Sequence, residues 1–99
     1  MTEEQKFKCR TIFEHYGLDN QFRILQEECA ELIQAASKYL RAQEAGKPIA
    51  QSKAALLEEV ADVMIMVEQI KGIFTGTALN AMLESKLNRQ IGRIRSENK

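Results

Sequence analysis

Apolar residues recur at steps of three and four along most of this chain, and short polar stretches with glycine or proline interrupt them. This spacing is typical of helices that bury one face. The interruptions fall at Gly17, at 46–51 and at 74–77, and they divide the chain into four segments. We expect helices over residues 2–16, 20–45, 52–72 and 77–96. No alternating apolar and polar run of useful length indicates a strand, so the expected fold class is all-α.

Residues beside the interruptions indicate where the helices begin and end. Gly17 suits the C-terminal end of the first helix. Asp19 or Asn20 is expected to cap the second helix, and Ser52 the third, because their side-chain oxygens accept backbone N–H groups. The second helix should bury one continuous stripe, formed by Phe22, Leu25, Cys29, Leu32, Ala36 and Tyr39.

The third helix is apolar nearly all the way round. Its two apolar stripes consist of Leu56, Val60, Val63, Val67 and Ile70, and of Leu57, Ala61, Met64 and Ile65. Such a helix must be covered on most sides, which three further helices in a small chain can hardly do. We therefore expect a four-helix, bundle-like domain that assembles as a homodimer or homotetramer, most simply through a two-fold axis. The alternative is a wide apolar stripe with some exposed methionines.

Length and charge limit what the chain can be. Its 99 residues form one domain, residues 1–99, which is large enough to bury a modest core without disulfide bonds. Fourteen basic and 14 acidic residues give a formal charge of zero, so no broad attraction to nucleic acid or to a membrane is expected. Cys9 and Cys29 have no metal-ligand spacing, and residues 1–10 do not resemble a signal peptide. A cytoplasmic protein without a membrane span is the expectation.

Two acidic motifs interrupt the apolar pattern. In "ALLEEVADVMIMVEQI", residues 55–70, the most apolar part of the chain contains Glu58, Glu59 and Asp62. The second helix carries a matching set in "LQEECAEL", namely Glu27, Glu28 and Glu31. Residues three apart lie on the same side of a helix, and two long helices joined by a short loop are expected to pack antiparallel. The two motifs lie about 15 and 13 residues from that loop, so they should face each other at similar heights.

Facing acidic motifs indicate a metal site. Carboxylates that meet in a partly buried space repel one another and lose hydration, which is costly unless a cation compensates. Oxygen ligands without histidine or cysteine favour a hard ion, Mg²⁺ or alternatively Mn²⁺, over zinc. The single histidine, His15, excludes a di-iron site, which needs two Glu-x-x-His motifs. One such motif alone is most often a solvated surface, whereas two at matching heights favour a metal site.

The two motifs resemble those of a known family. "EECAE" at residues 27–31, followed by "EVAD" at residues 59–62, is similar to the "EExxE … ExxD" signature of the MazG-like, all-α nucleoside triphosphate pyrophosphohydrolases. The likeness covers nearly the whole chain, including a long second and third helix that carry the acids and a basic fourth helix. It implies Mg²⁺-dependent hydrolysis of a nucleoside triphosphate between the α and β phosphates, which gives a monophosphate and pyrophosphate.

The resemblance also implies roles for single residues. The metal ligands are expected to be Glu28, Glu31, Glu59 and Asp62, and Glu27 or Glu58 is expected to hold or deprotonate the attacking water. Lys86 and Arg89, in a basic stripe of the fourth helix, are expected to bind phosphates, and Gln21 the base or sugar. The nucleotide stays open, from common or modified triphosphates to phosphoribosyl-ATP. The alternative function is a non-catalytic helical oligomer that binds a nucleotide or a partner protein, which the apolar third helix also suits.

Overall fold

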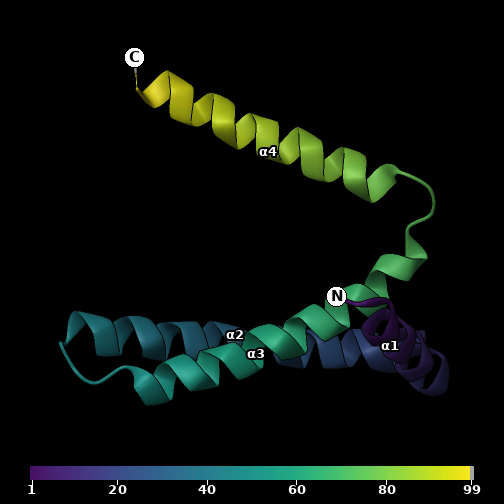
Figure 1. The fold of residues 1–99 in the computed structure, drawn as a ribbon, viewed down its shortest axis with the longest axis horizontal. Helices are drawn as coiled ribbons and strands as arrows, with labels where there is room; N and C mark the ends of the chain where they lie inside the picture. Colours follow the sequence, from purple (N-terminus) through teal and green to yellow (C-terminus); the bar gives the residue numbers. More distant parts are fainter. Residues whose placement is uncertain (99) are drawn as a thin grey trace.

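The computed structural model describes residues 1–98 and consists of helices joined by short connections (Figure 1). The elements in chain order are α1 (Glu3–Tyr16), α2 (Leu18–Glu44), α3 (Ala50–Ile70), the 3₁₀ helix η1 (Lys71–Ile73) and α4 (Ala78–Glu97). Residues 1–98 contain no β-strand, which confirms the all-α prediction. The expected helix boundaries differ from the observed ones by no more than two residues. Every helix in this part of the chain falls short of the length or the hydropathy that a transmembrane segment requires.

Local sequence explains both ends of α1. Its start is a capping box, in which the backbone N–H of Gln5 donates to the Thr2 hydroxyl at 3.1 Å and the Thr2 N–H donates to the Gln5 side chain at 2.8 Å. Its end is Gly17, whose φ of 87° suits glycine and turns the chain directly into α2. Because α2 begins immediately after this glycine, Asp19 and Asn20 lie inside its first turn. The prediction that one of them caps α2 is therefore wrong.

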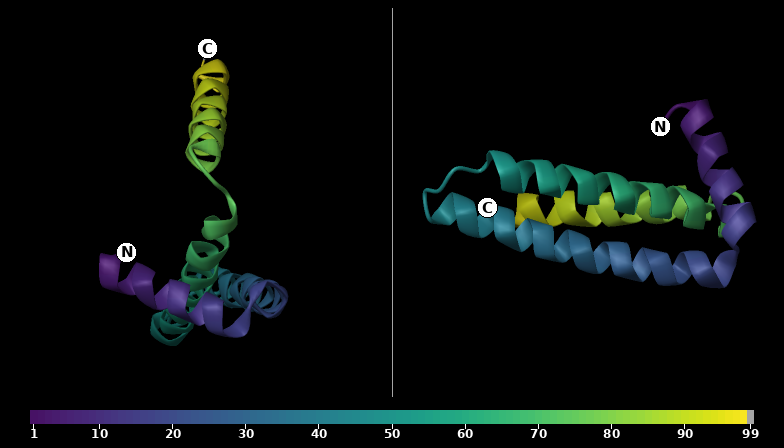
Figure 2. Two further views of the ribbon diagram at one scale, coloured as in Figure 1. Left: turned by 90° about the vertical axis from the view of Figure 1, so that its right-hand side faces the viewer. Right: turned by 90° about the horizontal axis from the view of Figure 1, so that it is seen from below.

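The helices α2 and α3 form an antiparallel hairpin, which is the main packing interface of the chain (Figure 1; Figure 2). Their connection contains Gly46, with a φ of 67°, and Pro48, which disfavours helical backbone at the residue before it. The prediction that Ser52 caps α3 is wrong: the helix starts two residues earlier, and the Ser52 hydroxyl donates to the Ile49 carbonyl at 3.2 Å. The helix α1 lies across the open end of the hairpin and contacts both of its helices.

Few side chains are buried in this arrangement. The buried apolar residues are Cys9, Ala35 and Met66. The expected stripe of α2 is half-buried along most of its length, but Ala35 rather than Ala36 packs inside. Gln21 and Gln69 are also buried, and the Gln21 amide donates to the Gln69 side-chain oxygen at 2.8 Å. This bond joins the start of α2 to the end of α3, and it satisfies polar groups that are costly to bury alone.

The helix α4 does not complete a four-helix bundle within one chain. It follows η1 and the connection at residues 74–77, and it runs apart from the other helices (Figure 1; Figure 2). It forms no packing interface with α1, α2 or α3, and none of its residues is buried. The expectation of a bundle-like domain is thus corrected for the single chain, which provides a three-helix unit and a separate fourth helix.

The chain exposes far more surface than a compact protein of its mass. Its accessible surface is 8045 Å², whereas a compact monomer of equal mass exposes about 5,700 Å². Its radius of gyration is 17.2 Å, against about 13 Å for a compact domain of this length. The second apolar stripe of α3 contributes to this exposure, since Leu57 is 70 % and Met64 54 % exposed. One chain therefore does not cover its own apolar helices.

Candidate metal-binding site

The antiparallel pairing of α2 and α3 brings the two acidic motifs together. Glu28 comes from α2, and Glu59 and Asp62 come from neighbouring turns of α3. One carboxylate oxygen from each of these residues lies within 4.8 Å of the other two. The similar distances of the motifs from the connecting loop account for this meeting. We refer to Glu28, Glu59 and Asp62 as the acidic cluster.

Two oxygens of the acidic cluster have no partner. Glu28 Oε2 and Glu59 Oε2 are inaccessible to solvent and accept no hydrogen bond. The ion pairs found in residues 1–98 lie elsewhere, on α1 and at the end of α3. Because an unsatisfied buried carboxylate oxygen is costly, these atoms point to a cation. The donors are oxygens only, which fits Mg²⁺ or Mn²⁺.

Burial and mutual repulsion raise the pKa of two glutamates in the acidic cluster. For Glu28, lost hydration is the main cause of the raised pKa, followed by the negative charges of Glu31, Asp62 and Glu59. For Glu59, lost hydration again raises the pKa most, and Glu31, Asp62 and Glu58 add to it. The fold therefore holds these acids together against their electrostatic preference, and a divalent cation at the same place reverses that penalty.

These raised pKa values predict that the metal-free protein loses stability as the pH rises. A glutamate whose pKa is higher in the folded state than in the unfolded state binds its proton more tightly when folded. The resulting stabilisation is complete below the unfolded pKa of about 4.3 and disappears as the pH rises through the folded pKa. In metal-free buffer, Tm should therefore fall as the pH rises above the unfolded pKa of these glutamates. Glu59→Gln should raise Tm at the higher pH, because it removes one of the repelling charges.

Calorimetry in the presence of a chelator measures this effect. The control is Glu14→Gln, which removes an exposed acid of α1 and should leave the pH dependence as in the wild type. Adding Mg²⁺ should raise the wild-type Tm more at the higher pH, because protonated carboxylates do not bind the ion. Equal Tm values for the wild type and Glu59→Gln at every pH would contradict this account of the cluster.

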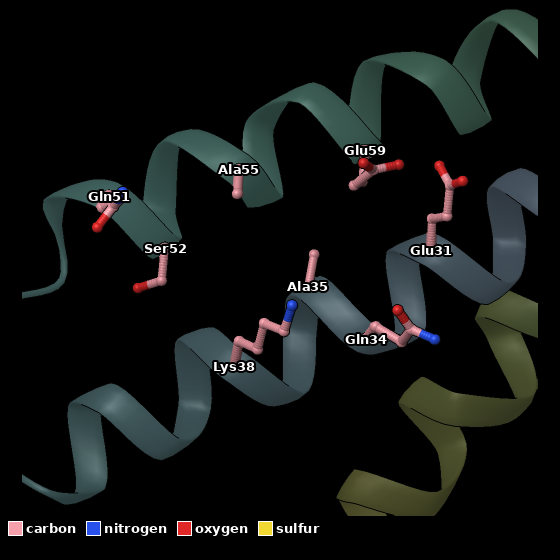
Figure 3. Close-up of a pocket in the computed structure, with 8 residues that line it drawn as sticks. All are labelled: Glu31, Gln34, Ala35, Lys38, Gln51, Ser52, Ala55 and Glu59. Atoms are coloured by element: carbon pink, nitrogen blue, oxygen red, sulfur yellow. The ribbon is translucent and has the colours of Figure 1, made fainter.

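A groove between α2 and α3 borders the acidic cluster on the side of the connecting loop (Figure 3). Its volume is about 400 Å³, and its lining residues are Glu31, Gln34, Ala35, Lys38, Gln51, Ser52, Ala55 and Glu59. The carboxylates of Glu31 and Glu59 face each other at one end, and Lys38 extends toward the space between the helices (Figure 3). Ala35 and Ala55 leave this space open because their side chains are short. We call this feature the polar groove.

The structure separates the predicted acidic residues into two groups. Three predicted ligands converge, but Glu31 lies beside them in the polar groove, exposed and outside the converging set. Glu27 and Glu58, the predicted water-activating residues, are also exposed and outside the acidic cluster. Glu58 is nevertheless close enough for its charge to raise the pKa of Glu59. The roles of Glu27, Glu31 and Glu58 stay predictions.

The predicted substrate-binding residues do not meet the acidic cluster within one chain. Gln21 is buried and its amide donates to Gln69, and its role in binding a base or sugar stays a prediction. Lys86 and Arg89 belong to α4, which runs apart from the hairpin that holds the acids (Figure 1). The phosphate-binding role of these two residues stays a prediction. The spacing of residues predicts that Lys86 and Arg89 share one face of α4. It does not predict the direction in which α4 runs relative to α3.

The cation that does line the polar groove is Lys38, which the motifs do not identify. It follows Glu31 by seven residues, or about two helical turns, so both residues lie on the same face of α2. This spacing is readable in the sequence, but a single lysine on a long helix is ordinarily solvated. Only the folded hairpin shows that Lys38 faces a groove, which it shares with the Ser52 hydroxyl.

A second groove lies beyond the acidic cluster, toward α1 and the open end of the hairpin. Its volume is about 400 Å³, and its lining residues are Ile12, Tyr16, Asn20, Gln21, Ile24, Ile65, Met66 and Gln69. Aliphatic side chains and one aromatic ring form most of its wall, together with three amide side chains. The acidic cluster is thus flanked along the hairpin by the polar groove on one side and by this amide-containing apolar groove on the other.

Comparison of the chain with protein-family models, with curated proteins and with solved structures finds no match. The type of site is therefore inferred from the arrangement of its residues. It is a carboxylate-only cluster between two antiparallel helices, suited to a hard divalent cation, with a charged groove and an apolar groove beside it.

Proposed function

We propose that this protein is a Mg²⁺-dependent nucleoside triphosphate pyrophosphohydrolase of the MazG-like type, with Mn²⁺ as the alternative ion. The observation that carries the proposal is the acidic cluster, in which carboxylates from two helices converge and two oxygens have no partner. The motifs that supply these acids, at residues 27–31 and 59–62, are those on which the resemblance to that family rests. The all-α fold with acids on its second and third helices agrees with the same family.

The proposed reaction is hydrolysis at the α-phosphorus of the nucleotide. A water oxygen forms a bond to this phosphorus, the bond to the oxygen that bridges the α and β phosphates breaks, and pyrophosphate leaves. The divalent cation held by the acidic cluster supplies neutralisation of the charge that develops on the phosphates. Phosphoryl transfer depends chiefly on positioning and on such neutralisation, so a helical scaffold without a covalent nucleophile suffices.

The acids around the cluster take two further roles in this proposal. Glu31, which faces Glu59 across the polar groove, is the fourth metal ligand (Figure 3). Glu58 is the preferred acceptor for the proton of the attacking water, because it is exposed to solvent and its charge reaches Glu59. Glu27 is the alternative acceptor, since it is exposed and is the neighbour of Glu28 on α2.

The two grooves suit the two ends of a nucleoside triphosphate. In the polar groove, the Lys38 ammonium offers a charge-assisted hydrogen bond to the phosphates that leave as pyrophosphate. In the apolar groove, the Tyr16 ring and the Asn20 amide offer stacking and hydrogen bonding to a base. The α-phosphate then lies at the acidic cluster between them.

A panel of nucleoside triphosphates with Mg²⁺ tests the function and the substrate class together. Pyrophosphate and monophosphate should appear in equal amounts, and a chelator should stop their release. Release of orthophosphate instead would contradict the assigned bond.

The second candidate function, a non-catalytic nucleotide-binding oligomer, is favoured by the exposed apolar surface of α3. It predicts that Mg²⁺ and nucleotide raise Tm with no turnover.

The placement of Lys38 predicts that Lys38→Ala weakens substrate binding. The variant should raise KM by about tenfold with a smaller change in kcat, because it removes a charge-assisted contact to the phosphates. Steady-state kinetics with the best nucleotide of the panel measures both constants. The matched control is Lys47→Ala, which removes an exposed lysine from the loop between α2 and α3. Equal KM values for Lys38→Ala and the wild type would exclude Lys38 from the phosphate site.

A further inference from the structure

Three amide side chains of the apolar groove, those of Asn20, Gln21 and Gln69, form one chain of hydrogen bonds. The Asn20 amide donates to the Gln21 side-chain oxygen at 3.3 Å, and the Gln21 amide donates to the Gln69 side-chain oxygen at 2.8 Å. The Gln69 amide in turn donates to the backbone carbonyl of Ile65 at 3.3 Å. We call Asn20, Gln21 and Gln69 the amide relay. Gln21 and Gln69 are buried, whereas Asn20 is exposed at the groove.

The inner end of the amide relay fixes the direction in which each amide points. A backbone carbonyl accepts hydrogen bonds and cannot donate them, so the side of Gln69 that faces the Ile65 carbonyl must carry the amino group. The Met66 sulfur, 3.6 Å from the same nitrogen, is also an acceptor. Gln69 therefore turns its oxygen toward Gln21, and Gln21 turns its oxygen toward Asn20. Flipping either buried amide would bring like groups together, which is costly away from water.

The outer end of the amide relay is the side-chain oxygen of Asn20. Because Gln21 holds the Asn20 amino group, this oxygen stays at the groove, and it has no hydrogen-bond partner among residues 1–98. An asparagine without such a neighbour can turn its amide by half a rotation and present either group. The relay removes this choice, so the groove offers a hydrogen-bond acceptor at a set place. The Tyr16 ring in the same groove offers a face to a planar ligand.

From this arrangement we infer that Asn20 determines which bases the groove accepts, and that Gln21 and Gln69 are the residues that position it. The ligand is a nucleobase with an N–H donor on the edge that faces Asn20, because an acceptor fixed in place rejects an edge without a hydrogen to donate. This inference rests on the proposed function for its ligand, a nucleotide. Gln21 then serves base recognition through Asn20 rather than by direct contact.

Two nucleotides that differ only in this donor test the selection. The best nucleotide of the panel is compared with an analogue in which methyl groups replace every N–H hydrogen of the base. The wild type should have a kcat/KM at least about tenfold lower for the analogue. Asn20→Leu keeps the size of this exposed side chain but offers no acceptor, so it should use both nucleotides about equally. An unchanged ratio in Asn20→Leu would mean that the bulk of the methyl groups causes the difference, and it would overturn the inference.

A double substitution tests the positioning role of the buried pair. Gln21→Met with Gln69→Met replaces both amides by apolar side chains of similar size, so neither leaves the other unpaired and calorimetry should find the fold intact. Asn20 is unchanged but its amide is free to turn, so most of the discrimination between the two nucleotides should be lost. Adding Asn20→Asp should restore it, because a carboxylate presents an oxygen in either orientation. A wild-type ratio in the double variant would show that the pair has only a structural role.

Free nucleosides separate this inference from the proposed hydrolysis, because they carry no phosphate. NMR titration of ¹⁵N-labelled protein should shift the side-chain amide signal of Asn20, and a parent nucleoside should bind at least about tenfold more tightly than its methylated analogue. Such binding without turnover of any triphosphate would count against the proposed function and support the inference. Turnover with equal kcat/KM for both nucleotides would overturn the inference and leave the function standing. Neither binding nor turnover would overturn both.

Discussion

Asp62→Asn should lower Mg²⁺-dependent turnover by about a hundredfold or more, because it removes one of the three carboxylates that converge in the acidic cluster and that the proposed function assigns to the cation. The amide keeps the size of the side chain, so the packing of α3 should not change. Pyrophosphate release at increasing Mg²⁺ concentration should show a higher Mg²⁺ requirement, and titration calorimetry should show weaker binding of the ion. Circular dichroism should show an unchanged fold, so a loss of turnover can be attributed to weaker metal binding rather than to unfolding.

The matched control for this experiment is Asp19→Asn. Asp19 is an exposed acid in the first turn of α2, outside the acidic cluster, so its amide should retain wild-type turnover and Mg²⁺ affinity. Wild-type turnover in Asp62→Asn would remove the metal assignment for this residue. A loss of turnover in both variants would indicate a general effect of net charge rather than a ligand at residue 62.

Leu87→Lys should dissociate the protein or prevent it from folding, although no residue of the acidic cluster changes. In a single chain Leu87 is 59 % exposed, so a lysine there should be tolerated. In an assembly that buries the apolar face of α4, the same lysine becomes an unpaired buried charge, which is costly enough to separate the subunits. Light scattering should report a smaller particle than the wild type, and activity should fall with it.

The control for Leu87→Lys lies two residues away on the same helix. Ser85 points to the side of α4 roughly opposite Leu87, because two residues turn an α-helix by about 200°. Ser85→Lys should therefore keep the wild-type mass and activity. A fully active monomer in both the wild type and Leu87→Lys would show that the apolar face of α4 is free in solution.

The spacing of residues along the chain was sufficient to predict the four helices and the all-α class. Helix formation depends on local periodicity and on breaks such as Gly17 and Pro48, which are readable without knowing what packs against what. The meeting of the two acidic motifs also follows from the sequence, because the short loop forces α2 and α3 to run antiparallel. Distance along each helix then sets the height of each acid.

Rotation of the helices about their own axes was not fixed by the spacing. The motif at residues 27–31 contains three glutamates, and only packing decides that Glu28 points at Glu59 and Asp62 while Glu27 is exposed. The same rotation buries Gln21 against Gln69 and turns Lys38 toward the polar groove. These outcomes depend on contacts between residues far apart in the sequence, which no local pattern encodes.

The position of α4 is the clearest case in which the sequence predicts a helix but not its placement. Its sequence determines a helix with an apolar stripe and a basic edge, but the backbone of the connection decides where that helix goes. Gly76, with a φ of 65°, and the extended Phe74 direct α4 away from the hairpin. The sequence alone therefore determined which side chains the chain carries on each helix: paired acids on α2 and α3, cations on α4, and apolar stripes. The tertiary structure decided which of these groups one chain brings together, because backbone angles at a few connecting residues set the distance between whole helices.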